Sequence, residues 1–238
     1  MHGHRIGLPA RLSSTSIGAL ERSLADAEAL DATVIVLEGA SPEVFCRGMD
    51  LTSIASETNA GGAVHGFARC LAALTHASRP TIAVIEGEAL GGGVGLAAAC
   101  DLTLASTDAS VGLPEALFGI LPAMIMPALL TRMSPQKARL LAMTGASESA
   151  EWANRAGLFD RVLEPSRLAR ASRKAERALS RVSPSTVTRL RRLLQEQGGS
   201  FDTRLADGAE LTAASIGDAE VRRSVTRFLE EGVAPWTA

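Results

Sequence analysis

Three short runs of β-branched and other apolar residues stand out in the first half of the chain. They read TVIVLEG at 33–39, TIAVIEG at 81–87 and CDLTLAS at 100–106. Near-continuous apolar runs of this length are typical of parallel strands that are buried on both faces. Helical patterns occupy 16–30 and 61–77, and a run of small residues occupies 92–100. Strands that alternate with helices predict an α/β fold.

From about residue 120 the pattern changes to successive short helices. Ser134 followed by Pro135, and Ser183 followed by Pro184, combine an N-cap serine with a proline in the first turn, which is how many helices begin. Longer amphipathic segments follow. We therefore expect a strand-rich first half and a helical last third, with helices at 165–182, 183–197 and 201–216.

Length and composition fit one compact domain with at most an appended subdomain, since 46% of the 238 residues are hydrophobic. A net charge of −2 and the absence of Tyr argue against a nucleic-acid binder. No apolar run reaches the roughly 18 residues of a membrane span, and the start lacks the apolar stretch of a secretory signal. The cysteines are few and widely spaced, which favours reduced thiols, a cytoplasmic protein and no metal site.

Basic residues gather in the segment 161–192, which has ten Lys or Arg side chains and only two acids, Glu164 and Glu176. A solvated helix face explains such a run, and we favour that interpretation. A docking surface for an acidic or phosphorylated partner is the alternative.

Two glycine turns carry the candidate chemistry: VFCRGMDL at 44–51 and GEALGGGVGLAAACD at 87–101. The second is neither a dinucleotide fingerprint, because the sixth position from Gly91 is Leu96, nor a phosphate-binding loop, because no Gly-Lys-Ser/Thr follows. What remains is a helix N-terminus with accessible backbone N–H groups, which attracts negative charge.

The first turn also provides an accessible backbone N–H group, since Gly48 permits a backbone conformation that would aim the Met49 N–H outward. Two converging N–H groups form an oxyanion hole, and one such donor is worth roughly 3–4 kcal/mol in a transition state. Either turn alone is explained by tight packing of the backbone. The presence of both turns is a far more specific indication of an oxyanion hole.

Together with LPEALFGILPA at 113–123, these turns resemble the crotonase (enoyl-CoA hydratase/isomerase) superfamily, over about residues 16–200. The resemblance implies an α/β fold, a crotonase-like spiral of ββα turns with a C-terminal helical region that builds trimers. The spiral core would span residues 1–180 and the helical region 181–238. It also implies an enzyme that acts on an acyl thioester and needs no separate cofactor or metal.

By motif position, the resemblance assigns the two oxyanion-hole amides to Met49 and Gly92. The neighbouring glycines would shape the substrate-binding backbone, and these are Gly48, Gly91 and Gly93. Hydratases of this family use two glutamates, whose positions here hold Gly95 and Glu115. One carboxylate is therefore present and one is missing.

Glu115 is the expected catalytic base, because a single carboxylate can still move a proton at a carbon next to a thioester. Its neighbours Leu113, Pro114, Ala116 and Leu117 are apolar, as a raised pKa requires. Glu115 could instead be a first-turn acid that complements a helix dipole.

Four further residues have two interpretations each. Asp50 caps the next short helix or joins the proton chemistry. Arg47 lies near the mouth of the site, where it would meet a substrate carboxylate or a pantetheine phosphate. Met124 lines the acyl pocket or belongs to the core. Cys46 is a core residue rather than a nucleophile, since no base is near it in sequence.

The segments 34–50 and 117–145, with glycine at 95, look closest to one branch of the family. Its members dehydrate 3-hydroxy-3-methylglutaryl groups on an acyl carrier protein during polyketide β-branching. That resemblance implies a hydro-lyase with a carrier-protein or acyl-CoA partner, assembled as a homotrimer or hexamer. A coenzyme A-dependent Δ3,Δ2-enoyl isomerase or hydratase is the second hypothesis. A non-catalytic partner of the same fold is the third.

Overall fold

The computed structural model describes residues 3–30, 32–55, 60–195 and 200–232. A five-stranded, fully parallel sheet lies at its centre, in the order β1-β2-β4-β6-β9. The three predicted strands are its middle members, so that prediction is confirmed. The sheet consists of β1 (His4–Gly7), β2 (Ile35–Glu38), β4 (Thr81–Ile85), β6 (Leu102–Ser106) and β9 (Arg161–Leu163).

A second, four-stranded sheet was not predicted from the sequence. Its strands have only two or three residues, which is too short for a hydrophobic period to be visible. All pairings are parallel except the last, between β7 and β8. The sheet consists of β3 (Val44–Cys46), β5 (Glu88–Leu90), β7 (Ser110–Gly112) and β8 (Glu148–Ser149).

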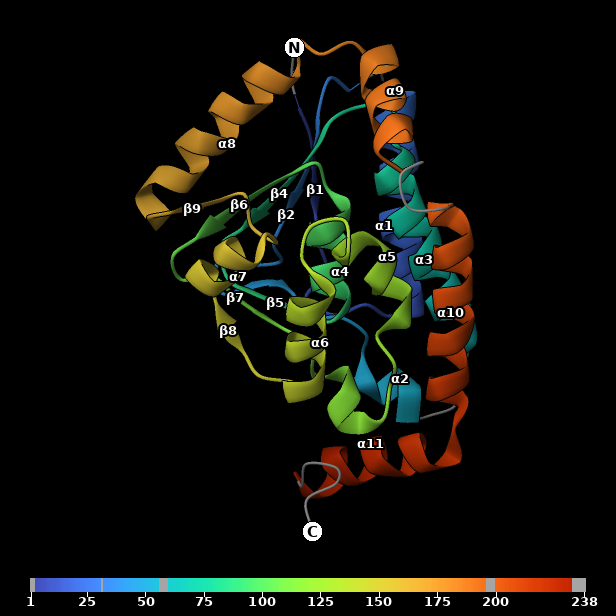
Figure 1. Cartoon of the computed structure of the whole chain (residues 1–238). Helices are drawn as coiled ribbons and strands as arrows, with labels where there is room; N and C mark the ends of the chain where they lie inside the picture. The colour runs from blue at the N-terminus through green and yellow to red at the C-terminus, as the bar shows by residue number, and fades with distance from the viewer. Residues whose placement is uncertain (1–2, 31, 56–59, 196–199, 233–238) are drawn as a thin grey trace.

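The chain alternates between the two sheets. In each of the pairs β2–β3, β4–β5 and β6–β7, the first strand joins the large sheet and the second joins the small one. Helices follow these pairs: α2 (Leu51–Ala55) and α3 (Ala60–His76) after the first, and α4 (Gly92–Ala99) after the second. This repeat is the expected ββα spiral, and Figure 1 shows α4 at its centre.

The predicted helices of the first half are present. Helix α1 (Ser14–Ala29) begins at a capping box on Ser13 and buries Ile17, Leu20 and Leu24. It packs against α3, which lies beside it in Figure 1. Of these two helices, α3 also packs against α4.

Short helices fill the middle of the chain, as the pattern predicted. The Ser134 hydroxyl accepts a hydrogen bond from the Lys137 N–H at 3.4 Å, which confirms that cap. The short helices of this middle region are the 3-10 helices η1 (Pro114–Phe118) and η2 (Ala123–Ile125), and the α-helices α5 (Met126–Leu129), α6 (Pro135–Thr144) and α7 (Ala150–Ala156).

Four helices complete the described chain: α8 (Pro165–Leu179), α9 (Pro184–Gln195), α10 (Phe201–Gly217) and α11 (Ala219–Glu231). Helix α8 covers the outer face of the large sheet through Leu168. Helix α10 packs along α3 and η2, and α11 packs on α2. The division into a core of 1–180 and a helical region of 181–238 stays a prediction, and residues 233–238 lie outside the described ranges.

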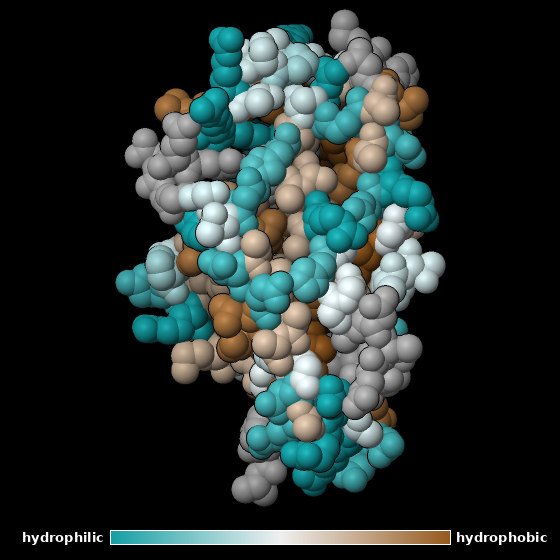
Figure 2. All heavy atoms as spheres, turned by 90° about the vertical axis from the view of Figure 1, so that its right-hand side faces the viewer, coloured by the Kyte–Doolittle hydropathy of each residue, from teal (hydrophilic) through white to brown (hydrophobic). Residues whose placement is uncertain are grey.

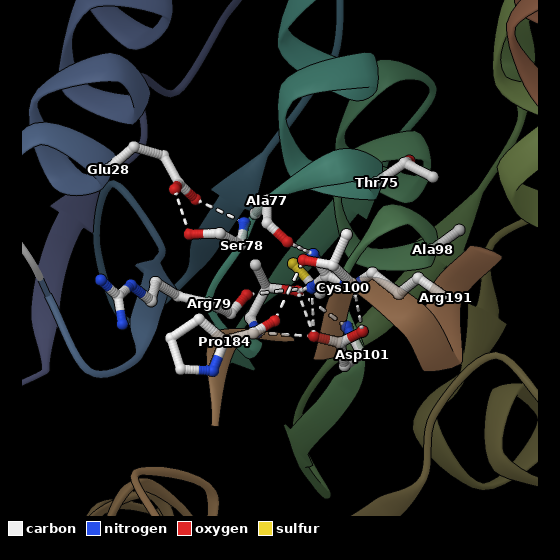
Figure 3. A network of polar contacts seen from close by, with 12 residues as sticks. Glu28, Thr75, Ala77, Ser78, Arg79, Ala98, Cys100, Asp101, Pro184 and Arg191 are labelled. Carbon is white, nitrogen blue, oxygen red and sulfur yellow. Dashed lines mark hydrogen bonds and ion pairs between the residues drawn. The ribbon is translucent and has the colours of Figure 1, made fainter. Parts of the chain in front are cut away.

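Arg191 fastens α9 to the spiral, as Figure 3 shows. Its guanidinium binds the Asp101 carboxylate at 2.5 and 3.0 Å and donates to the carbonyls of Ala77 and Arg79. Asp101 also accepts from the Thr81 N–H at 2.7 Å, at the start of β4. One half-buried cation therefore joins the C-terminal region to the ends of β4 and α3.

The three cysteines are free and buried. Within the described ranges, no helix is both long and apolar enough to cross a bilayer. The same ranges contain no group of three or more His, Cys, Asp or Glu side chains that could hold a metal ion.

Candidate active site

The two glycine turns meet in space. Gly48 has a φ of 72°, and a Cβ atom placed on it would lie 2.9 Å from the Gly92 nitrogen and 3.0 Å from the Leu90 carbonyl oxygen. Gly91, which caps α4, has a φ of 51°. Both turns therefore need glycine, for conformation and for close approach.

The small sheet brings these turns together. β3 and β5 pair in parallel, so the residues that follow both strands emerge at one edge. Met49 is further fixed by a parallel bridge to Leu12, in which the Leu12 N–H donates to the Gly48 carbonyl at 2.8 Å. The N–H groups of Met49 and Gly92 have no acceptor within the described part of the chain. An oxyanion hole needs two such donors, and its assignment to Met49 and Gly92 stays a prediction.

A cavity of about 240 Å³ opens beside these turns, and both Met49 and Gly92 line it. Its walls are mainly apolar. They come from η1 and η2, from Phe67 of α3, and from the C-terminal helices through Ile216 of α10 and Phe228 of α11. The cavity is thus built from segments distributed over the whole chain.

Glu115, in η1, lines the same cavity. Its carboxylate lies against Gly91, where any Cβ atom would collide with Oε1. Its Oε2 is buried and has no hydrogen-bond partner among the described residues. Burial raises the pKa of Glu115 to about 7, although its own backbone N–H acts in the opposite direction. Such a group can take up and release a proton near neutral pH.

The space beside Gly95 is filled by another side chain. A Cβ atom at this position would lie 2.5 Å from Cγ2 of Ile125, which itself lines the cavity. A glutamate would not fit there unless Ile125 moved. Glu115 is accordingly the one carboxylate among the described residues that line the cavity.

The other expected site residues divide into two groups. Arg47, Gly48, Gly91 and Met124 line the cavity. Gly93 does not, because its Cα faces the carbonyl oxygen of Cys46 at the strand before the first turn. It therefore acts through close packing of α4 on β3 rather than by lining the cavity.

Asp50 is a helix cap. Its Oδ1 accepts the Thr52 N–H at 3.1 Å, in the first turn of α2. Asp50 is not among the residues that line the cavity. The geometry supports the capping interpretation over a part in proton transfer.

Cys46 behaves as a core residue. It is fully buried, and burial raises the pKa of its thiol to about 11. A thiol of that pKa is almost wholly protonated at neutral pH and is a poor nucleophile.

Several cavity residues were not found from the sequence. Arg11 precedes α1 in a segment without a motif, and Thr212, Ile216 and Phe228 belong to helices far along the chain. Nothing local distinguishes these residues from others of their type. Ile216 and Phe228 do occupy apolar positions of amphipathic helices, but that pattern predicts burial and not a cavity.

Comparisons with known proteins agree with this geometry. The sequence profile described as enoyl-CoA hydratase/isomerase matches residues 10–238. The chain is 34% identical over 179 residues to a Mycobacterium leprae protein named probable enoyl-CoA hydratase echA8, covering 75% of this chain and 68% of the relative.

Two further comparisons concern one protein of Bacillus subtilis. The chain is 27% identical over 237 residues to the bacillaene synthase dehydratase PksH, covering 98% of this chain and 90% of the relative. The crystal structure of PksH superimposes with a TM-score of 0.85 and 25% identity, covering 97% of this chain and 94% of the other. The expected fold is therefore confirmed. By its matched profile, its fold and its relatives, the chain belongs to the enoyl-CoA hydratase/isomerase family, the crotonase superfamily that its motifs indicated.

Proposed function

We propose that the protein is a hydro-lyase that dehydrates a 3-hydroxyacyl thioester. Its specific substrate would be a 3-hydroxy-3-methylglutaryl group on an acyl carrier protein, converted to 3-methylglutaconyl during polyketide β-branching. The observation that carries the proposal is the Glu115 carboxylate against Gly91, whose buried Oε2 has no hydrogen-bond partner among the described residues. The relative PksH is named as a dehydratase and aligns with nearly the whole chain, which supports the same assignment.

The thioester carbonyl would bind between the N–H groups of Met49 and Gly92. Negative charge grows on its oxygen as the α-proton leaves, and both donors together with the α4 N-terminus stabilise that charge. Glu115 takes the α-proton. It then delivers a proton to the hydroxyl on the β-carbon as the C–O bond breaks. A C–H and a C–O bond are lost, a C=C bond forms, and water is released.

The site has one carboxylate where an ordinary hydratase has two, because Ile125 fills the space beside Gly95. Glu115 can act as base and acid in turn, since a carboxyl group that has taken the α-proton can deliver it to the β-hydroxyl. Hydration is the same path in reverse, so the concentrations of the two thioesters set the direction of net reaction. The surrounding apolar wall keeps bulk water away from the enolate.

The choice of a carrier protein over coenzyme A rests on the likeness to PksH, which is named as a synthase dehydratase, and not on the basic segment 161–192. Figure 1 places α8, which contains half of that segment, at the opposite end of the molecule from α11, whose Phe228 lines the cavity. We therefore interpret the exposed basic side chains of α8 as a solvated face.

Product analysis tests the proposal. The purified protein is incubated with the same 3-hydroxy-3-methylglutaryl group on a carrier protein and on coenzyme A, and products are identified by mass. We expect loss of one water with preference for the carrier protein. A strong preference for coenzyme A would reject the carrier-protein assignment. A shifted double bond without water loss would favour the isomerase hypothesis.

Glu115→Gln tests whether the protein is a catalyst at all. The amide keeps the shape of the side chain and cannot accept the α-proton, so we expect turnover to be abolished while the assembly state is retained. Turnover and light scattering are measured on both proteins. Unchanged turnover would remove Glu115 from its role. Absence of turnover in the wild type would favour a non-catalytic partner.

We propose further that the protein is a cytoplasmic homotrimer, or a hexamer of two trimers. Helix α9 exposes Leu190, Leu193 and Leu194, at 52, 58 and 65% of their surface. A groove of about 660 Å³ lies next to Leu194, and Figure 2 shows apolar surface on the face formed by α9 and α10. Leucines exposed so close together favour contact with another copy. Light scattering on the intact protein measures the number of subunits, and a monomer would contradict the proposal.

A further inference from the structure

Two arginines stand out on the otherwise apolar wall of the cavity. Arg11 and Arg47 are the cationic side chains among the described residues that line it. They come from neighbouring segments, because the Arg47 N–H donates to the Ala10 carbonyl at 2.8 Å and the Leu12 N–H donates to the Gly48 carbonyl at 2.8 Å. Both side chains therefore flank the turn that presents the Met49 N–H.

The two guanidinium groups are available for a ligand. Arg47 is held by Glu88, with Nε 2.5 Å from Oε2, and its two terminal nitrogens have no acceptor in the described ranges. The Arg11 guanidinium has neither an ion pair nor a hydrogen bond to any described residue. One acid for two guanidinium groups leaves a net positive charge beside the cavity.

Apart from the Met49 and Gly92 N–H groups, which the thioester oxygen would occupy, the described residues of the wall offer no other site for an anion. The Thr212 hydroxyl donates to the Leu121 carbonyl at 2.9 Å and accepts the Met124 N–H at 3.1 Å, so it is already satisfied. Glu115 would repel a negative group when it is ionised. A substrate carboxylate placed anywhere else on this wall would be desolvated without a partner, which is strongly unfavourable.

We propose that Arg11 and Arg47 bind a free carboxylate at the end of the acyl chain, and that they thereby select dicarboxylic acyl thioesters. This assignment rests on the function proposed above and identifies the residues that would recognise its substrate. In a five-carbon diacid the second carboxylate is three bonds from the carbon that Glu115 deprotonates. The chain folds back within the cavity, so that its free end meets the two arginines next to the first turn.

A phosphate of the carrier arm offers the same anionic chemistry. It lies at the far end of the long pantetheine arm, however, whereas Arg11 and Arg47 line the same small cavity as Glu115 and Met49. Position therefore favours the acyl carboxylate. The experiment separates the two sources by using arms with and without the phosphate.

Binding of unreactive thioesters tests the site without depending on turnover. Glutaryl-pantetheine and pentanoyl-pantetheine have the same number of acyl carbons, and only the first has a free carboxylate. We expect the wild type to bind the glutaryl thioester more tightly, and Arg11→Gln to reduce that preference by about tenfold or more. Arg11→Lys keeps the charge but loses the planar fork, and should retain part of the preference.

Arg170→Gln is the matched control, because Arg170 is an exposed arginine of α8 that does not line the cavity. It should leave the preference unchanged. Arg47→Gln should act like Arg11→Gln, with thermal unfolding measured for each variant to confirm folding.

Three results would overturn the proposal. They are equal binding of both thioesters by the wild type, an unchanged preference in Arg11→Gln, and an effect of Arg11→Gln that occurs only with phosphopantetheine thioesters. The last would assign the arginines to the arm phosphate. A clear glutaryl preference in a protein that releases no water would uphold the anion site and reject the dehydratase function.

Discussion

At the scale of single residues, Glu115 lies in surroundings that disfavour its own charge. Its Oε2 is buried without a partner, and its pKa rises from 4.5 to about 7 on folding. The folded protein therefore keeps a proton over a pH range in which the unfolded chain has lost it. The stabilisation that this residue provides is complete below about pH 4.5 and is lost as the pH rises through about 7.

Glu115→Gln should remove this pH dependence. The wild type should lose about 3 kcal/mol of unfolding free energy between pH 4.5 and pH 8 through this one group, since each pKa unit corresponds to about 1.4 kcal/mol. Denaturant unfolding of both proteins at several pH values gives the difference. Curves that stay parallel across this range would show that Glu115 is not buried as described.

Gly48→Ala should impair the site more than the fold. A Cβ atom would lie 2.9 Å from the Gly92 nitrogen and would occupy a left-handed backbone conformation. We expect a loss of about 1–3 kcal/mol in stability and a fall in kcat/KM of roughly 100-fold, because the two donors would be pushed apart. Gly61→Ala is the control, since its Cβ meets nothing within 4 Å. Equal activity in both variants would contradict the oxyanion-hole geometry.

At the scale of secondary-structure elements, one arginine makes most of the polar contacts that hold α9 to the spiral. Arg191 connects it to Asp101 and to the carbonyls at the end of α3 (Figure 3). The side chain of Arg191 is only 12% exposed. Removing it would take the guanidinium away from two carbonyls and from a partly buried carboxylate, which would keep only its hydrogen bonds from Thr81.

Arg191→Ala should therefore destabilise the protein by about 2–4 kcal/mol, with α9 the first element to open. Arg189→Ala, an exposed position on the same helix, should change stability by less than about 0.5 kcal/mol. Thermal unfolding and amide hydrogen exchange of α9 measure both effects. Similar losses of stability in the two variants would show that Arg191 does not hold α9 to the spiral.

At the scale of the whole molecule, the C-terminal helices complete the cavity. Phe228 of α11 meets Phe118 of η1 edge-on, with ring centroids 5.1 Å apart, and both residues line the cavity. Part of the cavity wall therefore comes from a helix near the end of the described chain. Figure 1 shows α11 across the end of the molecule beside α2.

Phe228→Ala should open this wall. We expect KM to rise by about tenfold with a smaller change in kcat, and stability to fall by about 1–3 kcal/mol because the side chain is only partly buried. Steady-state kinetics and denaturant unfolding measure the two effects. A fall in kcat alone, with KM unchanged, would show that α11 does not shape the binding wall.

The sequence alone determined the elements and residues whose signals are local. The apolar runs gave β2, β4 and β6, the serine–proline pairs gave two helix starts, and Glu115 stood out among apolar neighbours. These signals depend on periodicity, caps and turns, which act over a few residues. The two glycine turns were also visible in the sequence, although their contact was only inferred from the resemblance.

Tertiary structure decided everything that depends on which distant segments meet. It paired the two- and three-residue strands of the small sheet, placed Ile125 beside Gly95, and brought Arg11 and α11 to the cavity. Such contacts are set by long-range packing, which the residues next to a position in the sequence do not predict. For the same reason, the sequence named the acid at position 115, but only burial in the folded chain raises its pKa toward neutrality.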